Sequence, residues 1–128
     1  MGPHRVLPGR LSVSRTFGDI EAKHPRYGGN PKVVVSDPDI IKVQITSRSD
    51  FLILACDGVF DKLENKELID LVWRSVEDHM SLNTHSDLLE SICKLASVNI
   101  LKAAIARGTG DNVTCVVVAF EGLERRLN

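Results

Sequence analysis

The strongest constraint on the fold is a change in hydrophobic period along the chain. Residues 51–56 form an unbroken apolar run of strand length, and a second largely apolar run, interrupted by Thr114, spans 113–120. Between them, apolar residues recur every three or four positions over 65–80 and again over 88–103, which predicts two helices. Two consecutive helices between strands favour helices packed on an antiparallel sheet rather than alternating parallel units. We therefore expect an α+β fold.

Further strands are predicted upstream of the first apolar run. Residues 33–35 are β-branched throughout, and apolar and polar side chains alternate over 40–45. The polar segment 47–50 follows and has the composition of a turn. We therefore expect residues 43–46 to pair with 51–56 as a β-hairpin.

The boundaries of these elements also carry sequence signals. Asn65 is the predicted N-cap of the first helix, a capping-box pattern at 84–87 precedes the second, and Gly108 ends it. Residues 21–31 contain two prolines and two glycines and are expected to form an exposed, mobile loop. The charged residues 121–128 are expected to form a tail that frays.

Composition excludes several classes of protein. The 128 residues suit one ordinary domain, and 43% hydrophobic with 26% charged residues is typical of a globular chain rather than a disordered one. A net charge of −1 argues against an overall electrostatic attraction to nucleic acid or anionic lipid. No apolar run approaches the ~20 residues of a membrane span, and the first residues lack the apolar stretch of a signal peptide. We expect neither nucleic acid nor a membrane as a partner.

The three cysteines, Cys56, Cys93 and Cys115, are odd in number and widely spaced. Because the sequence contains no Cys-x-x-Cys pair, a zinc site or a redox pair is disfavoured. We interpret all three as reduced, buried, small hydrophobic residues, which favours the cytoplasm or the nucleus. A reactive thiol is the alternative, although no cationic neighbour is readable around any of them.

The exit of the first apolar run is the first place where chemistry is predicted. Asp57 follows the run directly, so its carboxylate is expected at the rim of the sheet, where it is held rigidly and still meets water. Gly58 permits a sharp turn and a close backbone approach. Asp61 is near enough in sequence to share one site. Carboxylate oxygens are the ligands that Mg²⁺ and Mn²⁺ prefer.

Two further segments carry polar residues that core packing does not require. Asp111 and Asn112 lie in a Gly-rich turn just before the last apolar run, where Asp111 could meet Asp57. Arg15 and Asp19 lie in a Ser- and Gly-containing segment, and the arginine could pair with a carboxylate or a phosphate. Each segment has a plainer interpretation, because Asp-Gly and Gly-Asp-Asn sequences are common turns.

Taken together, three segments resemble motifs of the metal-dependent protein serine/threonine phosphatases of the 2C type. They are LSVSRTFGD at 11–19, FLILACDGVFD at 51–61 and GTGDNVT at 108–114. Each motif alone is weakly specific, whereas three in the family's order and spacing are strongly specific. The resemblance covers residues 5–120 and corresponds to the C-terminal half of the family's catalytic domain, an α-β-β-α sandwich of antiparallel sheets flanked by helices.

The resemblance implies a role for each matching residue. Asp57 and Asp111 would be ligands in a centre of two Mg²⁺ or Mn²⁺ ions, and Asp61 a ligand of a further, weaker ion. Gly58, Asn112, Arg15 and Asp19 would shape or support the acidic loops. The loop 21–31 would be the family's flap, a segment near the cleft that influences substrate choice.

The family's N-terminal motifs are absent from this sequence, including an Asp-Gly-His-Gly segment whose Asp bridges both metals. We therefore expect a fragment of a phosphatase that acts on phosphoserine and phosphothreonine in proteins, itself weak or inactive, with no catalytic residue assigned beyond the metal ligands. A non-catalytic, phosphatase-like binding module is the alternative. Because both sheets of the family draw strands from both halves, exposed strand edges are expected to promote self-association.

Overall fold

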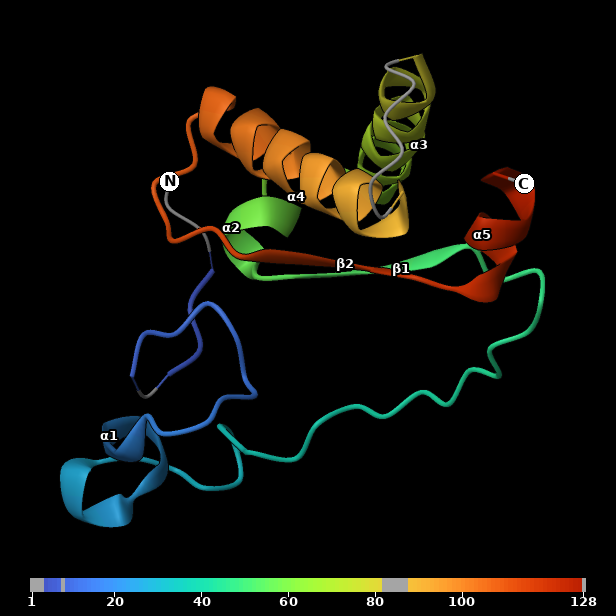
Figure 1. The fold of residues 1–128 in the computed structure, drawn as a ribbon. Helices are drawn as coiled ribbons and strands as arrows, with labels where there is room; N and C mark the ends of the chain where they lie inside the picture. Colours follow the sequence, from blue (N-terminus) through green and yellow to red (C-terminus); the bar gives the residue numbers. More distant parts are fainter. Residues whose placement is uncertain (1–3, 8, 82–87, 128) are drawn as a thin grey trace. The chain divides into compact units, whose positions relative to one another are not determined.

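The computed structural model describes residues 4–7, 9–81 and 88–127, and it divides into two compact units, Met1–Val43 and Gln44–Asn128 (Figure 1). The elements in chain order are α1 (Ile20–Lys23), the 3₁₀ helix η1 (Pro25–Tyr27), β1 (Phe51–Ala55), α2 (Asp57–Phe60), α3 (Asn65–Ser81), α4 (Leu88–Ala106), β2 (Cys115–Ala119) and α5 (Glu121–Leu127). The mixture of helices with an antiparallel sheet confirms the predicted α+β class.

The second unit is built on one antiparallel strand pair. β1 and β2 run in register from Phe51 opposite Ala119 to Ala55 opposite Cys115. α4 packs on β2 and α3 packs on α4, so both long helices lie on the same side of the pair (Figure 1). The strand predicted over 51–56 and the helix predicted over 65–80 are thus confirmed, with boundaries that differ by a residue.

The core of this unit lies between the helices and the inward face of the strands. It contains apolar residues from α2, α3, α4 and β2, so burial of all four elements depends on the same contacts. The buried members are Val59, Leu63, Leu68, Val72, Ala96, Ile100, Ala104 and Val117. A second cluster joins α3, α4 and α5 through Val76, Ile92 and Leu123.

The start of α3 is capped one residue earlier than predicted. Glu64, not Asn65, precedes the helix, and its backbone N–H donates to Glu67 Oε2 at 2.9 Å. This reciprocal contact is half of a capping box, which satisfies one of the donors that a helix start leaves without an intrahelical partner. The end of α4 is as predicted, since Gly108 takes a positive φ of 69° and donates to the Ile105 carbonyl at 2.9 Å. The predicted capping box at 84–87 lies outside the described residues.

The prediction of a fraying tail over 121–128 is wrong, because residues 121–127 form α5. Leu123 is fully buried and gives the helix an apolar anchor. Arg126 donates to Asp50 Oδ1 at 2.8 Å and lies 5.6 Å from the centre of the Trp73 ring. The sequence does not predict this helix, because the segment is highly charged and one buried leucine in so short a segment gives no helical period.

The strands predicted over 33–35 and 40–45, and the hairpin of 43–46 with 51–56, are also wrong. Residue 35 makes a single isolated bridge with residue 15, and residues 40–45 have no strand assignment. Ile40, Ile41 and Val43 are 77%, 86% and 79% exposed. Alternation predicts a strand only where a neighbour completes the hydrogen-bond ladder and covers one face, and among the described residues β1 pairs with β2 alone.

Most of the segment 21–31 is exposed as predicted, although Ala22 is buried, and it contains helical turns rather than a plain loop. Pro25 opens η1, where its fixed φ suits the first helical position. His24 Nδ1 accepts from the Arg26 N–H at 3.1 Å, and Gly28 closes the turn with a φ of 80°. Proline and glycine thus set up local turns here instead of preventing structure.

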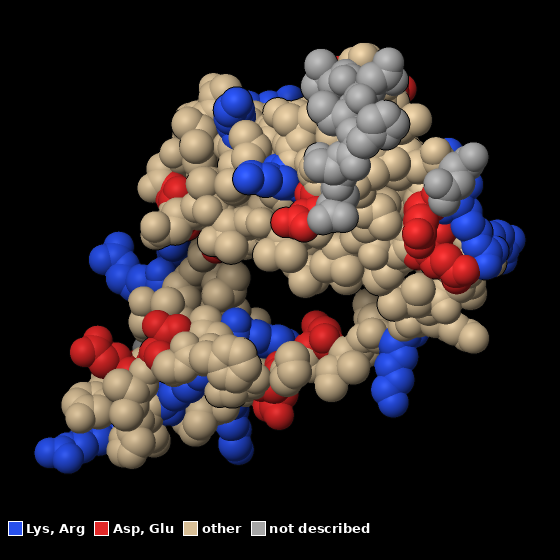
Figure 2. Space-filling view, viewed as in Figure 1, with Lys and Arg blue, Asp and Glu red and all other residues tan. Residues whose placement is uncertain are grey.

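The surface of the described part shows no dominant charge. Acidic and basic side chains are interspersed on the face in view (Figure 2). Across the described ranges, no helix is both long and apolar enough to cross a bilayer.

The three cysteines are free, but all are half-buried rather than buried, which corrects the interpretation from the sequence. Burial nevertheless raises the pKa of the Cys93 and Cys115 thiols.

Candidate metal-binding site

The two predicted acidic segments leave the sheet at the same end. The strand register ends with Ala55 opposite Cys115, and the Cys56 N–H continues the ladder by donating to the Thr114 carbonyl at 3.2 Å. Because the strands are antiparallel, the chain that leaves β1 and the chain that enters β2 are neighbours beyond this point. Residues far apart in sequence are thus brought together at one sheet end.

The closest approach is between Gly58 and Asn112. A Cβ placed on Gly58 would lie 2.2 Å from the Asn112 carbonyl oxygen and 3.4 Å from Asp111 Cβ. Only a residue without a side chain permits this separation. Asp57 and Asp111 are the immediate neighbours of these two residues, so the structure brings together the segments that carry the predicted ligands. The ligand role itself remains a prediction.

The three carboxylates are exposed, and hydrogen bonds to nearby backbone groups hold the residues that carry them in place. Asp57 Oδ1 accepts from the Gly58 N–H at 3.0 Å, and Asp111 Oδ1 accepts from the Asn112 N–H at 2.7 Å. Asp61 ends the single turn of α2, and its backbone N–H donates to the Asp57 carbonyl at 2.8 Å. All three side chains are accessible to a cation from solvent.

Cys56 connects the two segments, a role that no sequence pattern predicts. Its Sγ donates to the Asn112 carbonyl at 3.2 Å and accepts from the Thr114 N–H at 3.2 Å. A thiol is both a weak donor and a weak acceptor, so one side chain satisfies two backbone groups of the opposite segment. The apolar run around Cys56 indicates packing alone.

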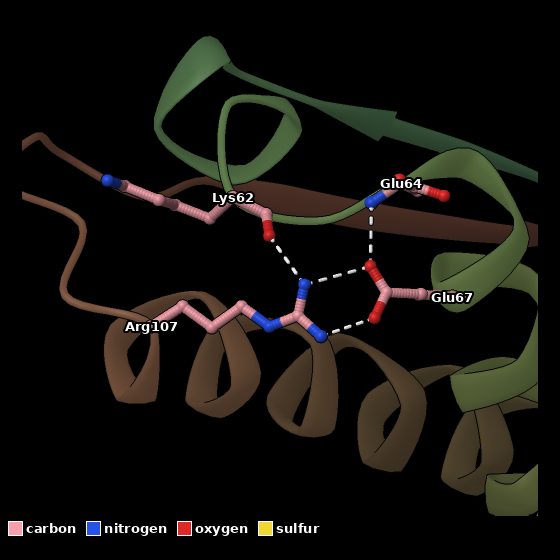
Figure 3. Close-up of polar contacts among 4 residues, drawn as sticks. All are labelled: Lys62, Glu64, Glu67 and Arg107. Atoms are coloured by element: carbon pink, nitrogen blue, oxygen red, sulfur yellow. Dashed lines mark hydrogen bonds and ion pairs between the residues drawn. The ribbon is translucent and has the colours of Figure 1, made fainter.

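Arg107 makes a second connection between the segments (Figure 3). Its Nη1 donates to the Lys62 carbonyl at 2.8 Å and to Glu67 Oε2 at 2.9 Å, and its Nη2 pairs with Glu67 Oε1. Glu67 also accepts from the Glu64 N–H, and the hydrogen-bonded guanidinium holds the pKa of the Glu67 carboxyl below its ordinary value of 4.5. No sequence pattern marks this pair, whose members are 40 residues apart.

Comparison with known proteins decides the family. The family model described as "Protein phosphatase 2C" matches residues 4–113, which contain all the predicted site residues. The chain belongs to the protein phosphatase 2C family. The resemblance carried by the three sequence motifs is therefore confirmed.

Several similar proteins have names that contain the words protein phosphatase or PP2C. Protein phosphatase ppm-1.A of Caenorhabditis elegans is 38% identical over 89% of this chain, and Protein phosphatase 2C homolog 2 of Saccharomyces cerevisiae is 35% identical over 88%. The chain spans 22% and 24% of those two proteins. It spans 61% of the PP2C-like domain-containing protein R307 of Acanthamoeba polyphaga mimivirus, to which it is 38% identical. The chain thus corresponds to part of each relative.

Two of the predicted 2C site residues belong to the first unit and are described within it. Arg15 donates to the Asp37 carbonyl at 2.8 Å and forms an ion pair with Asp39 at 3.1 Å, so it does pair with a carboxylate. Asp19 stands before α1 with a positive φ of 49°, and its carbonyl accepts from the Ala22 N–H at 3.0 Å. Both contacts fit a supporting role for loop geometry.

The 2C family is metal-dependent, and the present residues fit part of such a centre. Exposed carboxylates on two adjoining segments provide the hard oxygen ligands that Mg²⁺ and Mn²⁺ require. Within residues 4–7, 9–81 and 88–127, however, no group of three or more His, Cys, Asp and Glu side chains is arranged to hold an ion. The described residues therefore do not form a closed coordination shell by themselves.

Proposed function

We propose that the whole protein is a phosphatase that hydrolyses phosphoserine and phosphothreonine in proteins with a metal-activated water. The observation that carries the proposal is the meeting of the Asp57–Gly58 segment with Asp111–Asn112 at one end of the sheet. Family membership supports the reaction class, and phosphoproteins are the substrates that it implies. No phosphoenzyme is required, because water is the nucleophile.

The role of this chain is to hold and orient one side of the metal centre. Bound Mg²⁺ or Mn²⁺ would lower the pKa of water and orient the phosphate for in-line attack. Asp57 and Asp111 would supply ligands, and Asp61 would serve a further, weaker ion. Gly58 allows the close approach of the two segments, and Asn112 lies directly against it.

Supporting roles are proposed for the first unit. Arg15 and Asp19 would fix the loop that follows residue 11, through the contacts with Asp37, Asp39 and Ala22. Residues 21–31 would act as the flap that influences substrate choice; their exposure and their short, polar turns favour contact with a substrate protein.

Phosphate release measures the proposed reaction. With Mn²⁺ and a phosphothreonine peptide, the 128-residue chain is expected to show little or no turnover, because two carboxylates without a bridging partner bind Mn²⁺ weakly. A longer product of the same coding sequence that contains an Asp-Gly-His-Gly segment is expected to be active. That activity should be lost in Asp57→Ala and Asp111→Ala and retained in Asp70→Ala, an exposed acid on α3. Metal-dependent turnover that survives Asp57→Ala would refute the assignment.

A non-catalytic, phosphatase-like binding module is the second candidate. It is favoured if the coding sequence upstream lacks an Asp-Gly-His-Gly segment. Against it stand the three retained acids, Asp57, Asp61 and Asp111, because a docking surface has no need of carboxylates at these points.

The free cysteines support placement in the cytoplasm or the nucleus, where thiols stay reduced. Imaging of a tagged protein would test that placement.

We also propose that the isolated chain self-associates. The outward face of the strand pair carries Leu52, Leu54, Val116 and Val118, which are 44%, 52%, 49% and 37% exposed. Exposed apolar strand faces and unpaired edges favour association. Light scattering after size exclusion should show a mass that rises with concentration, and Leu54→Lys should reduce it. A monomer at high concentration would contradict the proposal.

A further inference from the structure

The contacts of Arg107 join the two acidic segments at a point that Cys56 does not reach. Arg107 stands four residues before Asp111, just after the end of α4, and begins the turn that carries it. The backbone carbonyl that it binds belongs to Lys62, the residue directly after Asp61. One side chain therefore connects the start of the Asp111 turn to the end of the Asp57–Asp61 segment (Figure 3).

We propose that Arg107, held by Glu67, is a positioning residue that sets the separation between the Asp57–Asp61 segment and the Asp111 turn. The inference rests on the proposed metal-binding function. It assigns Arg107 no contact with metal or substrate. We name the group the Arg107 clamp: Arg107, Glu67 and the backbones of Lys62 and Glu64.

The geometry of the clamp favours positioning over general stabilisation. A guanidinium donates in a planar fork, so it can bind both Glu67 oxygens and still reach a backbone carbonyl, which fixes its orientation. Glu67 is fixed in turn by the Glu64 N–H at 2.9 Å. The pair is nevertheless exposed, with Arg107 and Glu67 side chains 49% and 35% accessible, and exposed ion pairs contribute little to unfolding free energy.

The two connections leave the acidic turn restrained at both ends. At the end of the turn, Cys56 binds backbone groups of Asn112 and Thr114, and at the start of the turn Arg107 restrains the chain. Between them, a Cβ built on Gly108 or Gly110 would meet nothing within 4 Å, so local packing restrains the turn little. Loss of the clamp should therefore let the Asp111 carboxylate move relative to Asp57 while the core remains folded.

The test follows Mn²⁺ by NMR in the 128-residue chain. Paramagnetic broadening of the Asp57 and Asp111 amides reports Mn²⁺ binding where the two segments meet, because one bound ion broadens the amides of both. In Arg107→Ala, the Mn²⁺ concentration that broadens the Asp111 amide is expected to rise about tenfold, which is the lower end of the loss in metal affinity when a residue that orients metal ligands is removed. Arg125→Ala is the matched control, since it removes an exposed Arg–Glu ion pair within α5; it should leave both amides unchanged.

A charge exchange separates ion pairing from positioning. The double variant Glu67→Arg with Arg107→Glu keeps opposite charges together, but a carboxylate at 107 cannot donate to the Lys62 carbonyl. If the carbonyl contact sets the separation, this variant should bind Mn²⁺ as weakly as Arg107→Ala. Arg107→Lys, which retains the charge without the fork, should give an intermediate value and also serves if Arg107→Ala does not fold.

A readout without metal completes the test. The nuclear Overhauser contact between Gly58 and Asn112 should weaken in Arg107→Ala and stay intact in Arg125→Ala. Unchanged contacts and unchanged Mn²⁺ broadening in Arg107→Ala would overturn the positioning role and leave the metal site standing. Full recovery in the charge exchange would overturn it too. Absence of broadening at both segments in the unsubstituted chain would overturn the metal site and this inference together.

Discussion

Gly58→Ala is expected to destabilise the second unit, although alanine is usually the better helix residue. Gly58 lies within α2, where exchange for alanine ordinarily gains up to about 1 kcal/mol. The added Cβ, however, would lie 2.2 Å from the Asn112 carbonyl oxygen, a separation that real Cβ atoms do not show. The obstacle is backbone rather than a flexible side chain, so the chain at 112 must retreat by about 1 Å, and overpacking of this kind costs about 1–3 kcal/mol. The net expected loss is about 1–2 kcal/mol.

Gly110→Ala is the matched control for this substitution. Gly110 lies in the same acidic turn but has nothing within 4 Å of a built Cβ and no positive φ. Its replacement should be neutral or should stabilise by up to about 1 kcal/mol, because alanine restricts the unfolded chain. The two substitutions add the same methyl group and differ only in what that group meets.

Urea unfolding followed by Trp73 fluorescence measures both variants, because this tryptophan is the only one in the sequence and packs on Phe51 at 5.6 Å between ring centres. Gly58→Ala should lower the midpoint at unchanged slope, whereas Gly110→Ala should not. A Gly58→Ala chain as stable as the original would refute the close approach of the acidic segments, and with it the geometry of the proposed site.

Other substitutions test the core and the clamp. Ile100→Ala should cost about 2–5 kcal/mol in the same urea assay, because Ile100 is fully buried among α3, α4 and β2; a loss below ~1 kcal/mol would contradict the assigned core. Glu67→Gln should lose a small amount of stability, in a pH-dependent way, because its exposed ion pair contributes little to the unfolding free energy. Because the folded pKa of Glu67 lies below 4.5, its carboxylate stabilises the fold above that value, and this contribution disappears as the pH falls through the lowered pKa. The stability gap between Glu67→Gln and the unsubstituted chain should therefore close in acid, and a gap that widens below pH 4.5 would refute the Arg107 contact.

The elements that sequence predicts well are those with strong local signals and a buried face. The 65–80 helix repeats its apolar residues at helical spacing, and the 51–56 run is long enough for a strand, so α3 and β1 match their predicted ranges nearly to the residue. The two acidic segments of the second unit are also recognisable in the sequence, because each matches a family motif. In each case the information lies within a short window of the chain.

The predictions that fail depend on partners outside such a window. Residues 40–45 do alternate, but β1 pairs with β2, and no described strand pairs with this segment. The composition of 121–127 is that of a solvated tail, and only the fold shows that Leu123 of α5 is buried against Val76 and Ile92. Arg107 suits the charge of a helix end, and only folding brings it to Glu67 and Lys62.

By itself, then, the sequence determined which residues have the chemistry to bind a divalent cation. These are the hard carboxylates at 57 and 111, each next to a residue that permits a tight turn. Their wide separation in sequence leaves their distance undetermined, because no local rule relates residues so far apart. Tertiary structure decided that distance. The antiparallel register ends both strands at one edge, and a glycine without a side chain lets the two turns touch.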